Sequence, residues 1–281
     1  MANPQNGQTS DEMIGYHRRM QKTTANRIPI SAVIICKNAE QHISDVLTAL
    51  NKCDEIIVAD TGSTDRTIKI VKQFLNVRCI SLEFTGFGPT KNRALERANH
   101  EWILSIDADE VVNARCLDAC IETIQSASTN HVGRILRNNF ALGQKICHSG
   151  WGNDRLVRLF NKLHTRFSDS AVHESVIVQP DSLMLDIPGS MNHFTINSLN
   201  DFFSKTQLYT SLREQPQTSA KNSLTWAVIA AVSRFVKTYI FQRGMLDGRL
   251  GFIIAVANAQ GVFWRYAQQV NFSKNQNSGS N

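Results

Sequence analysis

The sequence lacks the cysteine spacing of a metal-binding module. Its six cysteines include no Cys-x-x-Cys pair and no zinc-finger spacing. Cys116 and Cys120 lie one helical turn apart, but no histidine or second cysteine pair completes a site with them. Scattered thiols in a chain of 281 residues are typical of a reduced protein, so we expect free cysteines and a cytosolic setting.

The sequence also lacks a long uncharged apolar run. None reaches the ~18–20 residues that span a bilayer, and the polar residues 1–27 contain no apolar signal core. We therefore expect a cytoplasmic protein, with contact to a membrane surface left open.

Acidic residues are in deficit. The chain has 24 Asp and Glu against 30 Lys and Arg, a net charge of +6 and a pI of about 9.1. A basic surface suits nucleotide sugars, anionic headgroups or nucleic acid. The basic residues form no dense patch with interleaved aromatics, which argues against nucleic acid.

Apolar residues make up 42% of the chain, enough for a sizeable core. Along the chain, short apolar runs typical of strands alternate with segments whose apolar residues have helical spacing. We predict strands at 30–36, 55–60, 77–82 and 102–106, and helices at 40–51, 65–74 and 90–98. Strands alternating with helices imply an α/β fold, with a mostly parallel sheet covered on both faces. Ligands bind such sheets at the carboxyl ends of the strands.

The pattern changes further along the chain. Residues 132–193 are β-rich, including 155–160 and 174–178, and apolar helices are expected at 228–241 and 251–266. This pattern predicts four parts: a flexible lead (1–27), an α/β domain (28–198), a helical extension (199–270) and a flexible tail (271–281). The apolar helices of this extension either pack on the α/β domain or present their aromatic and basic side chains to a membrane surface.

Aspartates occur at or just after the ends of two of the predicted strands. Asp107 and Asp109 follow the strand 102–106 one residue apart, and neighbouring carboxylates repel unless a cation lies between them. A hard divalent ion carrying a phosphorylated substrate would be such a cation. Asp60 ends another strand, where it is placed to accept from a base or ribose, and Asp65 is placed to cap the next helix.

The order of four motifs resembles a family 2 glycosyltransferase of the GT-A fold. These are Val33–Asn38, Asp60–Asp65, Lys91–Leu95 and Asp107–Asp109. The resemblance implies inverting transfer from a UDP-sugar with Mg²⁺ or Mn²⁺. It implies nucleotide-sugar contacts from Asn38, Glu40, Asp60, Lys91 and Asp107, and a metal contact from Asp109.

Further motifs narrow the resemblance to bacterial lipopolysaccharide core glucosyltransferases acting on heptose. These are Lys37–Glu40, Gly86–Asn92, Val172–Glu174 and Arg243–Gly248, and the similarity covers about residues 28–267. Ala39 departs from the pattern, because many relatives carry an acidic residue there. The resemblance implies a lipopolysaccharide acceptor and a peripheral location on the inner face of the inner membrane.

Direct displacement at a sugar carbon needs one general base for the acceptor hydroxyl. We predict Glu174 as this base, with Asp169 and Asp154 as the alternatives. His193 is a candidate second metal ligand if the ion is Mn²⁺. Arg155 and Arg158, three residues apart in a strand, face opposite sides, so only one is expected at the diphosphate or acceptor.

Trp151 is a candidate to stack on a sugar, although an aromatic at a strand start is more often part of a core. Other functions remain open: transfer to another surface glycan or lipid-linked acceptor, nucleotidyl transfer, or nucleotide-sugar binding without catalysis. A nucleotidyltransferase usually has a glycine-rich loop after its first strand, and residues 36–40 contain no glycine.

Overall fold

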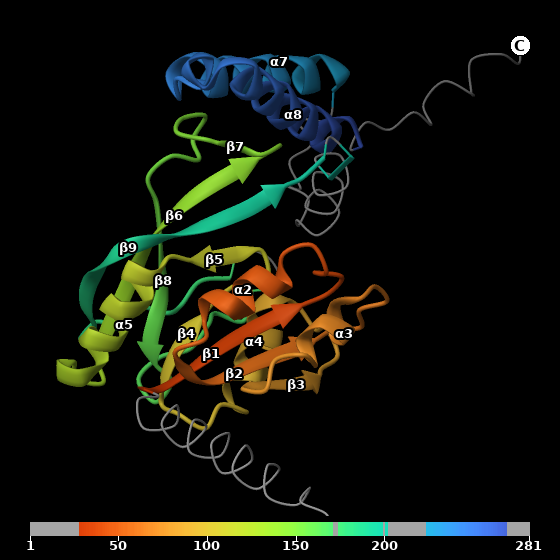
Figure 1. The fold of residues 1–281 in the computed structure, drawn as a ribbon. Helices are drawn as coiled ribbons and strands as arrows, with labels where there is room; N and C mark the ends of the chain where they lie inside the picture. Colours follow the sequence, from red (N-terminus) through yellow and green to blue (C-terminus); the bar gives the residue numbers. More distant parts are fainter. Residues whose placement is uncertain (1–27, 171–173, 199, 202–222, 269–281) are drawn as a thin grey trace, which may run out of the picture.

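The first half of the chain forms a parallel sheet, as expected. The computed structural model describes residues 28–170, 174–198, 200–201 and 223–268 (Figure 1). Four parallel strands stand in the order β3-β2-β1-β4. Their bounds are β1 (Ile28–Cys36), β2 (Cys53–Asp60), β3 (Val77–Ser81) and β4 (Trp102–Ser105).

Helices cover both faces of these strands. Alternate residues of a strand point to opposite faces, so Ala32 and Ile34 of β1 enter one core cluster while Val33 enters the other. The helices α2 (Ile43–Ala49), α3 (Thr67–Val71) and α5 (Ala114–Ser126) pack on the first side, and α4 (Phe87–Leu95) packs on the second. The expected α/β architecture is confirmed.

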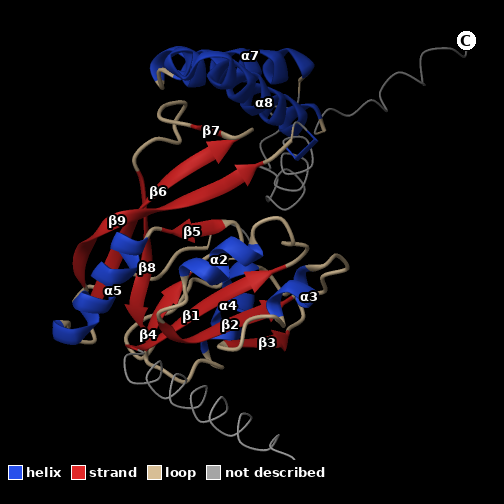
Figure 2. Ribbon diagram, in the orientation of Figure 1, coloured by secondary structure: helices blue, strands red, loops and turns tan. Residues whose placement is uncertain are grey.

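The second half extends the sheet with mixed strand directions (Figure 2). The antiparallel β8 pairs with β4, and the order continues β8-β6-β9-β5, with β7 on β6. These strands are β5 (Glu110–Val112), β6 (His131–Ala141), β7 (Gln144–Lys145), β8 (Asp154–Asn161) and β9 (Leu183–Ile196). The β-rich region 132–193 is therefore confirmed.

Two local expectations need correction. Residues 174–178 form no strand, because Val176 makes only an isolated bridge to Phe167. Val176 is buried against the face that α4 covers, so its apolar character reflects core packing rather than a ladder. The helix α5 had not been predicted, although it carries an Asn113 cap that accepts from the Cys116 N–H at 2.8 Å.

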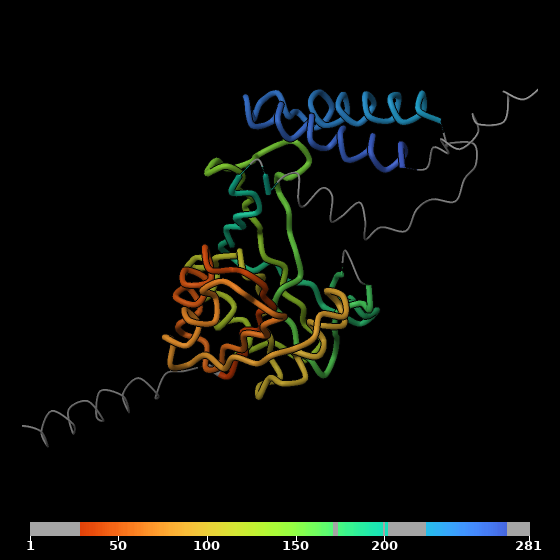
Figure 3. Tube along the Cα trace, turned by 90° about the vertical axis from the view of Figure 1, so that its right-hand side faces the viewer, coloured from red at the N-terminus to blue at the C-terminus, as the bar shows by residue number. Residues whose placement is uncertain are grey.

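A helical hairpin stands beyond the far end of β6 and β9 (Figure 3). It comprises α7 (Leu224–Val236), a π-helical turn η2 (Lys237–Phe241), a 3₁₀ turn η3 (Gly244–Asp247) and α8 (Gly248–Ala267). By length and composition Leu224–Phe241 is also a candidate membrane span, with a mean hydropathy of 1.3, but it contains Arg234 and Lys237.

All six cysteines are unpaired, as expected. The proposed lead and tail lie outside the described residues, as does most of the stretch between Leu199 and Leu224. The four-part division of the chain therefore stays a prediction.

Candidate active site

The carboxyl ends of β1, β2 and β4 lie side by side. Cys36 at the end of β1 is in register with Asp60 at the end of β2, and the Ile106 N–H donates to the Val33 carbonyl at 3.1 Å. Asp60 and Asp107 therefore belong to one edge of the sheet. This is the edge where parallel α/β sheets bind ligands.

The Asp60 carboxylate organises the loop that follows it. It accepts from the Gly62 N–H at 3.1 Å and from the N–H and hydroxyl of Ser63. Gly62 has a φ of +100°, which a residue with a side chain rarely adopts. Asp60 is 8% exposed, so it is placed at the edge of the sheet with its oxygens already bonded to the loop.

Asn38 and Glu40 join the loop after β1 to the loop after β2. Asn38, with a φ of +53°, accepts from the Thr64 N–H at 2.8 Å through its side-chain oxygen. Glu40 accepts from both the N–H and the guanidinium of Arg66 at 3.0 Å, and these hydrogen bonds lower the pKa of Glu40. The N-cap of α3 is Arg66 rather than Asp65 and makes no side-chain cap bond, although the Asp65 carboxylate accepts from the N–H of Thr67, the first residue of α3, at 2.9 Å.

Lys91 connects Asp107 to Glu174. Its ammonium nitrogen lies 2.7 Å from Asp107 Oδ1 and 2.7 Å from Glu174 Oε1, and its side chain is 3% exposed. The same nitrogen stands 5.1 Å from the centre of the Phe167 ring. A buried ammonium needs such partners, because a charge removed from water without them is very costly.

The Gly86–Asn92 motif explains how Glu174 reaches Lys91. The Asn92 amide donates to the Phe167 carbonyl at 3.0 Å and accepts from the Phe167 N–H at 2.9 Å. A Cβ at Gly88 would stand 1.9 Å from the Ser168 carbonyl oxygen, so only glycine admits this approach. The motif therefore holds the segment before Glu174 against α4.

Arg158 is the second cation on Asp107. Its guanidinium lies 2.6 Å from Asp107 Oδ2 and 2.6 Å from Glu110 Oε1. Burial alone would raise the pKa of Asp107, but Arg158 and Lys91 hold that pKa well below its usual range. Two protein cations, Lys91 and Arg158, therefore balance the charge of the Asp107 carboxylate.

Asp109 faces a different set of partners. The Asp109 Oδ2 atom lies 3.5 Å from His193 Nε2, and His193 Nδ1 lies 2.7 Å from the side-chain oxygen of Asn139. The Asn139 amide nitrogen donates to the Trp151 carbonyl at 2.8 Å, which orients the amide. His193 Nδ1 therefore donates to the Asn139 oxygen, and Nε2 is the ring nitrogen that faces Asp109.

The alternative bases have other partners. Asp169 pairs with Arg166 at 3.0 Å, and both side chains are exposed. Asp154 pairs with Arg137 at 2.6 Å. Glu174 differs from both, because its partner Lys91 also binds Asp107.

The two arginines of β8 face opposite sides, as expected. Arg158 is buried on Asp107, whereas Arg155 is exposed with a guanidinium nitrogen 3.6 Å from Asp186 Oδ1. Trp151 packs against the cluster of Ala141, Ile146, Ile196, Leu250 and Ile254. Its contacts are those of a core side chain, the commoner alternative for this residue.

Three residues of the region had not been singled out from the sequence. Glu110 is fully buried between Arg158 and Arg137 and accepts from the Asp107 N–H at 3.1 Å. Asn139 orients His193. Asp247 accepts from the Ser149 hydroxyl at 2.7 Å and from the His148 N–H at 3.1 Å. The Arg243–Gly248 motif was the signal for Asp247, whereas no local pattern marks the other two.

The model of the family "Glycosyl transferase family 2" matches residues 31–174. This range includes Asp60, Lys91, Asp107 and Glu174, and it covers half of the chain. The chain belongs to glycosyl transferase family 2. Its fold is of the GT-A type with a C-terminal helical hairpin, as the resemblance implied.

The similar proteins include other bacterial glycosyltransferases. The chain is 28% identical over 246 residues to the lipopolysaccharide core biosynthesis glycosyltransferase LpsC of Rhizobium meliloti, covering 84% of this chain and 90% of LpsC. It is 28% identical over 258 residues to an uncharacterized glycosyltransferase of Rickettsia typhi, covering 85% and 86%. A solved structure of S. aureus TarS with UDP has a TM-score of 0.43 at 14% identity, covering 85% and 90%.

Proposed function

We propose that this glycosyltransferase moves a hexose, with glucose as the first candidate, from a UDP-sugar to a heptose of the lipopolysaccharide inner core, with inversion. The observation that carries the proposal is the Asp107–Lys91–Glu174 bridge. This bridge joins Asp107, at the edge of the sheet proposed to bind the nucleotide, to Glu174, the proposed base for the acceptor hydroxyl. The name of the relative LpsC supports the choice of acceptor.

The residues divide between the two sides of the reaction. Asp60 and Asp107 lie at the strand ends, where they hold the nucleoside and ribose. Glu174 takes the proton of the acceptor hydroxyl as the glycosidic bond forms and the bond to the diphosphate breaks. A single carboxylate base with no protein nucleophile gives inversion.

The residues at Asp109 fit a divalent cation. The described residues contain no group of three or more His, Cys, Asp or Glu side chains that could hold a metal. Asp109 and the Nε2 lone pair of His193 supply two ligands, and Mg²⁺ or Mn²⁺ commonly completes its sphere with substrate phosphate oxygens and water. When bound, the ion acts as a Lewis acid that offsets charge on the UDP leaving group.

The same proposal places the enzyme in the cytoplasm, peripheral on the inner face of the inner membrane. UDP-sugars and the lipid-anchored acceptor meet there. Membership of family 2 supports glycosyl transfer over nucleotidyl transfer or binding without catalysis.

The test is transfer by the purified protein. It is incubated with UDP-glucose, Mg²⁺ or Mn²⁺, and a truncated heptose-containing core, and UDP release and product mass are followed. UDP-galactose and UDP-N-acetylglucosamine are the comparison donors. The proposal fails if no donor supports transfer to the heptose core while a different surface glycan or lipid-linked acceptor does accept sugar.

A further inference from the structure

The helical hairpin presents an apolar surface that no described part of the chain covers. Its helix α7 packs on α8, and Ala227 is the buried residue of α7. Val232 is 57% exposed, Phe241 78% and Leu246 61%. Further exposed apolar side chains lie along the two helices and the turns η2 and η3 between them: Leu224, Trp226, Val228, Ile229, Ile240, Met245, Phe252, Val256 and Trp264.

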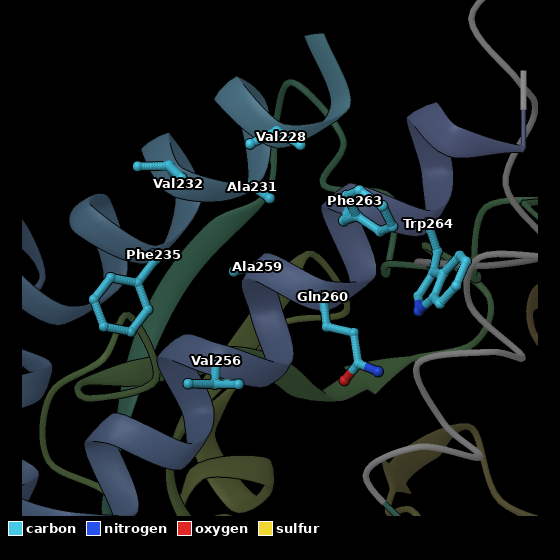
Figure 4. A pocket seen from close by; sticks show the side chains of 9 residues that line it. All are labelled: Val228, Ala231, Val232, Phe235, Val256, Ala259, Gln260, Phe263 and Trp264. Carbon is cyan, nitrogen blue, oxygen red and sulfur yellow. The ribbon is translucent and has the colours of Figure 1, made fainter. Parts of the chain in front are cut away.

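A groove of about 600 Å³ runs between the two helices on this surface (Figure 4). Its lining is apolar except for one glutamine: Val228, Ala231, Val232, Phe235, Val256, Ala259, Gln260, Phe263 and Trp264. Soluble monomers rarely expose a contiguous apolar surface of this kind unless something binds to it.

The charges of the hairpin are of one sign where they are exposed. The basic residues between 224 and 267 are Arg234, Lys237, Arg243, Arg249 and Arg265. The acidic residue in this range is Asp247, whose side chain is 4% exposed and faces His148. Among the described residues none of the five cations forms an ion pair, and Lys237, Arg243 and Arg249 are exposed, so the charge of these three is available to an external anion.

The attachment of the hairpin relates it to the candidate active site. Leu250 and Ile254 of α8 pack on Ala141 of β6 and Ile196 of β9. Ile196 follows His193 by three residues, a distance of about 10 Å along a strand. A surface bound to the hairpin would therefore lie near the Asp109 and His193 end of the site.

We propose that the α7–α8 hairpin binds the surface of an anionic phospholipid bilayer. Val232, Phe241 and Leu246 enter the headgroup and acyl boundary, and the exposed cations bind lipid phosphates. An apolar helix pair with only basic exposed charges is the chemistry of interfacial binding. The inference deepens the peripheral location of the proposed function by assigning it to the hairpin, and it holds whichever sugar the enzyme transfers.

The experiment measures flotation of the full chain with vesicles. The vesicles are phosphatidylcholine with or without phosphatidylglycerol, at low and high salt. We expect binding to the anionic vesicles, weakened by salt. Val232→Ser with Phe241→Ser should reduce binding about tenfold or more. Lys237→Gln with Arg249→Gln should do the same on anionic vesicles only.

Matched controls lie on the catalytic domain. Leu75→Ser with Leu163→Ser removes two apolar side chains that are 84% and 69% exposed, and Lys69→Gln with Lys72→Gln removes two exposed cations. Neither pair should change flotation. UDP release with a soluble, deacylated acceptor should stay at the wild-type rate in the hairpin variants, which separates membrane binding from the proposed reaction.

Three results would overturn the inference. The first is equal binding to neutral and anionic vesicles or none to either. The second is protein that resists extraction by salt and alkaline carbonate, which would mean that Leu224–Phe241 spans the bilayer. The third is a dimer in light scattering that the Val232→Ser and Phe241→Ser changes dissociate, which would mean that a second copy covers the surface.

Discussion

The ammonium nitrogen of Lys91 lies 2.7 Å from Asp107 Oδ1 and 2.7 Å from Glu174 Oε1. One buried cation therefore connects the end of β4 to the segment packed against α4. In the proposed reaction, the side that holds the donor and the side that activates the acceptor share this cation. A substitution of Asp107 or Glu174 therefore changes the electrostatic environment of the other carboxylate through Lys91.

Lys91→Met should destabilise the protein and abolish transfer. The substitution leaves two carboxylates without their common cation, and removing one partner of a buried pair costs about 3–5 kcal/mol. Asp107 is partly exposed, so we expect about 3 kcal/mol, the low end of that range, in urea unfolding. Lys52→Met removes the partner of Asp118 at the surface and should cost less than about 1 kcal/mol. Equal costs for the two variants would mean that the bridge is absent in solution.

Glu174→Gln should reduce transfer by about 10²–10⁴ while leaving UDP-sugar binding intact, because it removes a general base and keeps the shape of the side chain. Rates come from UDP release, and binding comes from calorimetry. The matched control is Asp169→Asn, whose carboxylate is exposed on Arg166. Near-normal transfer by Glu174→Gln would reassign the base to Asp169 or Asp154.

Because of the ion pairs of Asp107, the free energy of unfolding should fall at acid pH. The pKa of Asp107 in the folded protein lies below the unfolded value of 3.8, so its ionised form stabilises the fold. This contribution is complete above about pH 5 and is lost as the pH falls through the folded pKa. The difference in unfolding free energy between the wild type and Asp107→Asn should shrink below that pH. A difference that stays constant down to strongly acidic pH would contradict the ion pairs with Lys91 and Arg158.

Asn139→Leu should weaken Mn²⁺ binding in the presence of UDP by about 10- to 100-fold, the usual effect of losing a group that orients a histidine ligand. Binding is measured by electron paramagnetic resonance of Mn²⁺, and removing metal with a chelator should stop transfer. The neighbouring Asn138 bonds to Ser190 and Asn192 instead, so Asn138→Leu is the control. Unchanged Mn²⁺ affinity in Asn139→Leu would remove His193 from the proposed site.

Asp247→Asn should loosen the hairpin from the catalytic domain. The carboxylate accepts from the N–H groups of Cys147 and His148 and from the Ser149 hydroxyl, and an amide nitrogen cannot accept these bonds. We expect a loss of about 1–3 kcal/mol in the free energy of unfolding and faster proteolysis at the junction of η3 and α8. Asp118→Asn, at an exposed pair, is the control. Equal proteolysis of both variants would contradict the role of Asp247.

Much of the fold was predictable because its signals are local. The run 30–36 and the alternation after it predicted β1 to β4 and the helices between them, and α4 lies over most of its predicted range. The prediction of a strand at 174–178 was wrong. Val176 is apolar because it packs in the core, and it forms only an isolated bridge to Phe167 instead of a strand pairing. Periodicity alone does not separate these two cases.

The sequence by itself determined the alternation of strands and helices and the positions of Asp60 and Asp107 at strand ends, since those follow from neighbouring residues. Only the tertiary structure decided which charges meet. Lys91 and Glu174 are 83 residues apart, and Arg158 reaches Asp107 over 51. Their contacts depend on the packing of α4 and the order β1-β4-β8 in the sheet. No local pattern encodes that packing, because it results from burying both faces of the whole sheet.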